Sequence, residues 1–153
     1  MLVGMPYAIH RLLPDQLADF RALNALYAAA FEDDENYLLH PPSDAYVHEH
    51  LSQRHIVHLV AKQGEAVIGA LSAYILAKHE QDRSETYIYD LAVAATHRRQ
   101  GIATALIEAL KPIAREQGAW VIFVQADPPD APAVALYTGL GSREDVLHFD
   151  IPV

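Results

Sequence analysis

The residues with the clearest chemical potential are Arg98, Gly101 and Ala103, which stand in the order Arg-x-x-Gly-x-Ala. They follow an alternating β-branched and aromatic run, Tyr87 to Val93, that predicts a buried strand, and they precede an apolar pattern with helical spacing. A strand that enters a helix through a glycine turn leaves backbone N–H groups unpaired at the positive end of the helix dipole. Glycine also lets a phosphate approach this backbone without a Cβ in the way. The turn therefore predicts a pyrophosphate site for a phosphorylated cofactor.

The elements that must position this turn follow from apolar periodicity and from turn residues. The predicted strands are residues 6–11, 56–62, 66–76, 85–93, 120–125 and 146–151. The predicted helices are one from Pro14-Asp15 to the acids at 32–35, then 44–52, 101–117 and 131–140. Ser43 should cap the second helix, Gly118 should end the third, and Gly69 predicts a bulge inside its strand.

The order β-α-α-β-β-β-α-β-α-β, with no internal repeat and no linker, predicts one α/β domain over residues 1–153 with a mixed sheet. Of the residues, 52% are hydrophobic and 20% are charged, which is typical of globular rather than disordered proteins. The chain has no cysteine, and this excludes disulfides, thiolate zinc sites and a cysteine nucleophile.

The formal charge of −9 counts against nucleic acid as a partner, because an acidic surface repels phosphate backbones. It would instead attract a polycation, although acidity that merely keeps a protein soluble would look the same. The first residues, 1–7, lack the basic and long apolar regions of a signal peptide, and no apolar run reaches membrane-spanning length. We therefore expect a cytoplasmic location and no membrane partner.

The order of elements, with the Arg98 motif after the fourth strand, resembles the GNAT superfamily of N-acetyltransferases. The second half of the chain is most similar to the type I aminoglycoside 3-N-acetyltransferases. The strings that carry the resemblance are YIYDLAV at 87–93, HRRQGIATALI at 97–107, VQAD at 124–127, PAVALYT at 132–138 and HFDI at 148–151. It implies a single-domain α/β fold whose mixed, mostly antiparallel sheet is splayed at the fourth and fifth strands, with flanking helices. It also implies acetyl transfer to the 3-amino group of 2-deoxystreptamine aminoglycosides of the gentamicin type, which gives antibiotic resistance.

The resemblance further implies an acetyl-CoA site. Backbone groups of Leu91, Ala92 and Val93 would pair with the pantetheine arm like an added strand. The pyrophosphate would be wrapped by residues of the glycine turn, namely Arg98, Arg99, Gly101, Ile102, Ala103 and Thr104. Asp130 and Ala133 would also contact the cofactor, although the superfamily often has asparagine where this chain has Asp130. The alternative is that the two arginines are a solvated pair and the glycine marks a plain turn.

Two residues are candidates for proton transfer. Tyr137 matches the superfamily's tyrosine near the cofactor sulfur and would protonate the departing thiolate as a general acid. Periodicity alone would make it a core aromatic residue. Asp90 is the candidate general base, since an amine acceptor arrives as an ammonium and must lose a proton; the alternative is that it only binds the ammonium or stiffens the strand. A backbone amide of Leu91 or Val93 would hold the oxyanion.

Further acids are candidates for the remaining ammonium groups of a polyamine sugar. They are Asp33, Asp34, Glu35, Glu80, Asp127 and Asp150. No metal site is expected, because His48 and His50 would point apart on a helix and no cysteine completes a ligand set. A homodimer is implied by the resemblance alone. Polyamines or protein amines are the alternative acceptors. A third hypothesis is a protein that binds the cofactor or the drug without turnover.

Overall fold

The computed structural model describes residues 6–153, which form a five-stranded sheet in the order β1-β2-β3-β4-β5. The strands are β1 (Ala8–Arg11), β2 (Ile56–Gln63), β3 (Ala66–Ala77), β4 (Ser84–Val93) and β5 (Ala119–Val124). Neighbouring strands are antiparallel except β4 and β5, which run parallel. The predicted mixed, mostly antiparallel sheet is therefore confirmed.

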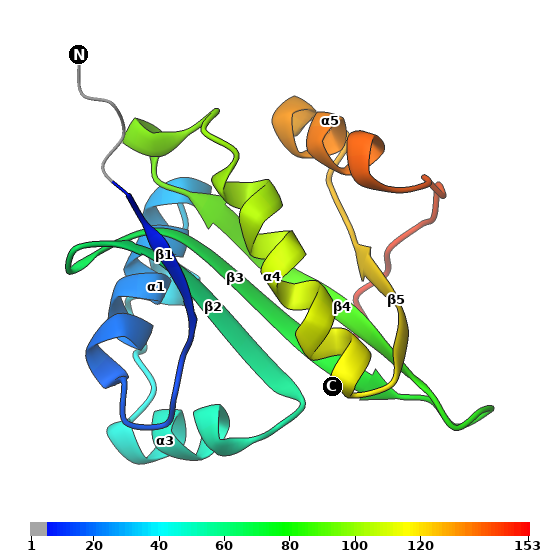
Figure 1. Cartoon of the computed structure of the whole chain (residues 1–153), viewed down its shortest axis with the longest axis horizontal. Helices are drawn as coiled ribbons and strands as arrows, with labels where there is room; N and C mark the ends of the chain where they lie inside the picture. The colour runs from blue at the N-terminus through cyan, green and yellow to red at the C-terminus, as the bar shows by residue number, and fades with distance from the viewer. Residues whose placement is uncertain (1–5) are drawn as a thin grey trace.

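The helices cover both faces of this sheet. They are α1 (Leu17–Phe31), α2 (Asp34–Tyr37), α3 (Asp44–Ser52), α4 (Ile102–Glu116) and α5 (Ala131–Leu140), with a short 3₁₀ turn at Ala95–His97. α4 lies on one face, and α1 and α3 lie on the other (Figure 1). Within residues 6–153, no helix combines the length and the apolar composition needed to cross a membrane.

Strand alternation divides the apolar interior into two layers. In β2, Leu59 packs with α4 residues such as Leu106, whereas its neighbour Val60 packs with Leu23 of α1. These four side chains are almost fully buried. Burial of one such side chain stabilises the fold by about 1.5–3 kcal/mol relative to leaving it exposed to water. The sheet is thus fixed from both faces, and its strand ends can carry a site.

Local signals place several helix ends where the sequence predicts them. α3 and α5 occupy the predicted residues, and Ser43 caps α3 by accepting a hydrogen bond from the Tyr46 amide at 3.1 Å. α1 ends at Phe31, where Glu32 takes a left-handed conformation with φ of 52°. The short helix α2 was not predicted; Asp33 caps it by accepting from the Asn36 amide at 3.2 Å.

Gly69 positions α4 against the sheet. The register shifts beside it, so that Ala61 pairs with Gly69 and Lys62 with Val67, and the predicted bulge is confirmed. A Cβ on Gly69 would lie 2.8 Å from Cγ2 of Ile102, the first residue of α4. The glycine therefore allows the start of α4 to approach β3 closely, next to the end of β4.

β4 carries a second irregularity at the place where it leaves β5. Ser72 of β3 pairs with Asp90, but the next residue, Ala73, pairs with Ile88, so Tyr89 is an extra residue. The pairing of β4 with β5 ends at Ile88 and Val124, while β4 continues to Val93. β5 itself ends at Val124, and the chain beyond it runs away from β4 toward α5 (Figure 1). The splay expected between the fourth and fifth strands is present.

The predicted last strand, residues 146–151, is wrong. Residues 142–153 belong to no strand, and their apolar side chains are exposed, as in Val146, Leu147, Phe149 and Ile151. Alternation of apolar and polar residues predicts a strand face but does not provide a partner edge. β5 is the last strand of the sheet, and no described segment pairs with its outer edge.

Candidate active site

A cavity of about 260 Å³ opens where β4 and β5 separate. Its lining comes from α1, β4, β5, the loop after β5 and α5, and comprises Phe31, Ile88, Tyr89, Asp90, Leu91, Val124, Gln125, Ala126, Asp127, Asp130, Ala133 and Tyr137. Both predicted proton-transfer residues, Asp90 and Tyr137, lie in this lining although they are far apart in the chain. The fold therefore brings together the two residues that the sequence singled out for catalysis.

The Asp90 carboxylate is half-buried and is held by Tyr37. The Tyr37 hydroxyl donates to Oδ2 of Asp90 at 2.8 Å. Burial raises the pKa of the Asp90 carboxyl, and the Tyr37 bond lowers that pKa by a smaller amount because it favours the charged form. A carboxylate with a raised pKa that is fixed at a cavity wall is suited to accept a proton.

Sequence reasoning missed Tyr37, because the residue is 53 positions from its partner and lies in an unpredicted helix. Its phenol packs beside the rings of Tyr27 and Phe31, at centroid distances of 5.7 and 5.8 Å. Burial and the neighbouring Asp90 carboxylate raise the pKa of Tyr37, so it remains a protonated donor. No local signal in the sequence identifies this pair.

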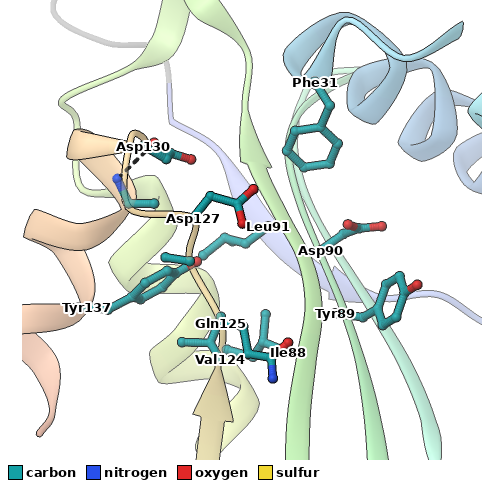
Figure 2. A pocket seen from close by; sticks show the side chains of 12 residues that line it. Phe31, Ile88, Tyr89, Asp90, Leu91, Val124, Gln125, Asp127, Asp130 and Tyr137 are labelled. Atoms are coloured by element: carbon teal, nitrogen blue, oxygen red, sulfur yellow. Dashed lines mark hydrogen bonds between the residues drawn. The ribbon is translucent and has the colours of Figure 1, made fainter. Parts of the chain in front are cut away.

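Tyr137 reaches the cavity from α5. Burial raises the pKa of its phenol to about 12, and the carboxylate of Asp130 adds to that rise. The hydroxyl is therefore protonated at neutral pH and can donate a proton. In Figure 2, Leu91 and Tyr137 point toward each other, whereas Asp90 and Tyr89 project from β4 to the side on which Phe31 lies. The two candidate proton-transfer groups thus face the cavity from opposite sides of β4.

The predicted phosphate turn lies between β4 and α4. Arg99 and Gly101 both take positive φ, 60° and 76°, and Gly101 is the N-cap of α4. A Cβ on Gly101 would meet nothing within 4 Å, so the backbone conformation, rather than crowding, is what favours glycine. The first helical bond runs from the Ala105 amide to the Gly101 carbonyl at 2.9 Å, which leaves the amides before Ala105 pointing out of the helix end. This arrangement fits an anion, and Arg98 lies beside it.

The sequence model of the acetyltransferase (GNAT) family matches residues 20–141. The chain belongs to the GNAT family of acetyltransferases. The match covers the cavity residues as well as the phosphate turn, and the observed sheet has the splay expected of this family. Acetyl-CoA is the acetyl donor of GNAT enzymes, and it is the cofactor of this one.

Known proteins agree with this assignment. Rat N-acetyltransferase 8B is 31% identical over 133 residues, which are 85% of this chain and 60% of that protein, so the chain spans 60% of its relative's length. A crystallised aminoglycoside acetyltransferase from an uncultured soil metagenomic sample has 51% identity and a TM-score of 0.95, over 97% of this chain and 99% of that one. Another, in complex with sisomicin and also from such a sample, has 31% identity and a TM-score of 0.88, over 96% of both chains.

Within residues 6–153, the end of β4 has a strand neighbour on one side only. Leu91, Ala92 and Val93 pair with β3 on one side, at Leu71, Ala70 and Gly69. On the other side β5 has already ended, and the Val93 carbonyl there accepts from Arg98 Nε at 3.5 Å. The remaining backbone groups of this edge offer pairing positions for an extended ligand. Ala133 and Asp130 line the cavity across from this edge.

The acids predicted to bind substrate do not lie in one cluster: some are in or near the cavity and others are remote from it. Asp127 lines the cavity. Asp130, which was predicted as a cofactor contact, lines it too and caps α5 by accepting from the Ala133 amide at 3.3 Å (Figure 2). Asp33, Asp34 and Glu35 begin α2, the helix that carries Tyr37.

Two of the predicted acids lie away from the cavity. Glu80 is in the turn between β3 and β4, where it pairs with Lys78 at 3.4 Å, roughly 20 Å along β4 from Asp90 at 3.3 Å per residue. Asp150 is in the exposed C-terminal segment and accepts from His148 at 2.9 Å. Among the described residues, no three His, Asp or Glu side chains are grouped to hold a metal ion.

Two aromatic side chains of the cavity were not predicted as site residues. Tyr89 is 61% exposed and Phe31 is 42% exposed, and they lie on either side of Asp90 in Figure 2. Exposed large aromatic residues beside a buried carboxylate are a typical feature of a ligand site. The alternation of β4 could have revealed Tyr89, but the bulge that turns it to the same face as Asp90 is visible only in the structure.

Proposed function

We propose that this GNAT enzyme transfers the acetyl group of acetyl-CoA to the 3-amino group of a 2-deoxystreptamine aminoglycoside of the gentamicin type, and so gives antibiotic resistance. The observation that carries the proposal is the cavity at the β4–β5 splay, which holds Asp90, Asp127 and Tyr137 together. The formal charge of −9 favours a polycationic acceptor. The 51% identity to an aminoglycoside acetyltransferase supports the same class of substrate.

We assign one group of the site to each step of the reaction. Bound acetyl-CoA supplies the thioester carbonyl that the acceptor amine attacks. A carboxylate oxygen of Asp90, whose pKa is raised by burial, takes the proton that the acceptor ammonium must lose. A backbone amide of Leu91 or Val93 donates to the oxygen on which negative charge develops. Tyr137, protonated at neutral pH, gives its hydroxyl proton to the departing sulfur.

Arg98, Arg99 and the turn of Gly101 to Thr104 would hold the pyrophosphate. Guanidinium groups offer several donors in one plane, and Thr104 adds a hydroxyl to the amides of the helix end. Both arginines are exposed, and the long 3.5 Å bond from Arg98 Nε to the Val93 carbonyl leaves the other guanidinium donors to reach an anion. The cofactor and the acceptor would therefore approach β4 from opposite sides, as Tyr137 and Asp90 do.

The walls of the acceptor side favour a ring over a linear amine. Asp90 lies between the exposed rings of Phe31 and Tyr89, which can pack against the C–H faces of an aminocyclitol or sugar ring. Asp127 lines the same cavity and can pair with a second ammonium group. Asp33, Asp34 and Glu35 of α2 are the next candidates, because the Tyr37 bond ties this helix to the site.

We also infer a homodimer. The segment 142–153 exposes Val146, Leu147, Phe149 and Ile151, and no strand within residues 6–153 pairs with the outer edge of β5. A second copy of the chain, with the same segment and the same edge, is the partner that both features fit. Light scattering should give the mass of a dimer, and the double variant Leu147→Glu/Phe149→Glu should give that of a monomer. A monomeric natural chain would contradict the inference.

The function is tested by thiol release from acetyl-CoA with three acceptors: gentamicin, spermidine and a peptide with a free amino terminus. We expect rapid release with gentamicin, and we expect NMR of the product to place the acetyl group on the 3-amino nitrogen. Efficient acetylation of spermidine or the peptide, with gentamicin untouched, would instead support the alternative acceptors. If acetyl-CoA binds but none of the amines causes thiol release, the result would support a binding protein without turnover.

A further inference from the structure

A chain of buried polar side chains crosses the α1 face of the sheet and ends at the catalytic strand. It consists of Tyr27 in α1, Ser72 in β3, His58 in β2 and His50 in α3, and we call it the buried polar chain. The Tyr27 hydroxyl lies 2.9 Å from Ser72 Oγ, Ser72 Oγ lies 2.7 Å from His58 Nδ1, and His58 Nε2 lies 2.8 Å from His50 Nε2. At the other end, Tyr27 Oη is 3.5 Å from the backbone oxygen of Asp90.

Three members of this chain are almost completely removed from solvent. Tyr27, Ser72 and His58 are only 1%, 4% and 6% exposed. Buried polar groups without partners destabilise a fold, whereas apolar side chains of the same size would fill this interior without any such requirement. A contribution to overall stability therefore does not explain the buried polar chain. Its contact with the backbone of Asp90 is the better indication of its role.

The contacts of the buried polar chain admit two opposite arrangements of protons, and the Tyr27 contact with the Asp90 oxygen selects one of them. Burial lowers the pKa of His58 to about 3, so its ring is neutral and carries a single N–H. If Tyr27 donates to the Asp90 oxygen, Ser72 must donate to Tyr27, and His58 Nδ1 must donate to Ser72. His58 Nε2 then accepts from His50. In this arrangement every donor points toward Asp90, and His50 on α3 is the outer end.

The buried polar chain ends at the bulge of β4. Ser72 is the strand partner of Asp90, and Tyr89 is the extra residue beside that pair. A bulge interrupts the regular ladder and leaves its backbone groups in need of other partners. Tyr27 supplies such a partner to the Asp90 oxygen, and its ring also packs against Tyr37, which holds the Asp90 carboxylate.

We propose that Tyr27, Ser72 and His58, anchored at α3 by His50, are positioning residues that fix the β4 bulge and thereby the place of the Asp90 carboxylate. The functional consequence rests on the proposed role of Asp90 as the general base. None of the four is among the residues that line the cavity at the β4–β5 splay. Their effect on the reaction passes through the backbone of Tyr89 and Asp90.

The test compares Tyr27→Phe and Ser72→Ala with the control Tyr46→Phe, which removes the hydroxyl of an exposed tyrosine on α3. Tyr27→Phe keeps the ring that stacks on Phe31 at 5.6 Å. We expect kcat with gentamicin to fall by about tenfold in both test variants, since small misplacements of a reacting group cost up to about a hundredfold. The KM for acetyl-CoA and the acidic limb of the pH profile should not change, because the Tyr37 bond remains.

Two further readouts separate positioning from mere packing. The double variant Tyr27→Phe/Ser72→Ala should be no slower than the slower single variant, because members of one chain are not additive. Without any acceptor, amide hydrogen exchange at Tyr89, Asp90 and Leu91 should be faster in both test variants than in the Tyr46→Phe control. Unchanged exchange at these amides, or an unchanged kcat, overturns the proposal. If the natural chain acetylates no amine, the proposed function fails, and the exchange experiment alone still decides on the bulge.

Discussion

The hydrogen bond between Tyr37 and Asp90 makes a quantitative prediction about pH. Removal of the hydroxyl in Tyr37→Phe takes away a donor that favours the charged carboxylate, so the pKa of Asp90 must rise. A hydrogen bond to a charged group is worth about 1.5–3 kcal/mol, and 1.36 kcal/mol moves a pKa by about one unit. The lower end applies here, because water in an open cavity replaces part of the lost bond. We therefore expect an upward move of about one pH unit.

The sign of this effect on the reaction follows from the role of the base. Asp90 must be deprotonated to accept a proton, so kcat/KM falls as the pH drops through its pKa. In Tyr37→Phe this fall should begin at higher pH, while the rate on the plateau above it stays within a few-fold of the natural enzyme. The assay is the pH profile of thiol release with one acceptor, so that titration of the acceptor amine is common to both enzymes.

A matched control is Tyr87→Phe. Tyr87 also lies on β4, but its hydroxyl donates to the neutral amide oxygen of Gln125 at 3.0 Å instead of to a carboxylate. This variant should leave the acidic limb in place. A limb that does not move in Tyr37→Phe, or that moves to lower pH, refutes the reasoning; carbon NMR titration of the Asp90 carboxyl gives the same answer without turnover.

Four other substitutions, two of them with a matched control, test the site and its support. Asp90→Asn should lower kcat by about a hundredfold or more without changing the KM for acetyl-CoA. Tyr137→Phe should lower kcat by a smaller factor if water can protonate the thiolate. Equal rates in Asp90→Asn and the natural enzyme would show that Asp90 is not the general base. Gly101→Ala should raise the KM for acetyl-CoA and destabilise by about 1–2 kcal/mol in thermal unfolding, whereas Gly118→Ala, with a similar φ of 78°, should destabilise equally without touching that KM. Gly69→Ala should destabilise by about 1–3 kcal/mol because its Cβ would lie 2.8 Å from Ile102, while Gly139→Ala, with open space, should not.

The sequence by itself determined the features that depend on neighbouring residues. The Ser43 cap, the left-handed Gly101 at the start of α4 and the alternation of β4 are local, so their signals lie within a few positions of the structure they produce. The phosphate turn and the two proton-transfer candidates also lay within recognisable strings. These signals were sufficient to predict the class of fold and to propose a cofactor site at the start of α4.

Only the tertiary structure decided what surrounds Asp90. The Tyr37 bond joins residues 53 apart, and the buried polar chain joins four elements, so neither has a local signal. The β4 bulge follows from the register against β3, which no periodicity specifies. The segment 146–151 illustrates the converse, since its alternation was clear but a strand also needs an edge to pair with. The sequence determines which side chains each helix and strand carries. Tertiary packing determines which of those side chains come into contact in the site.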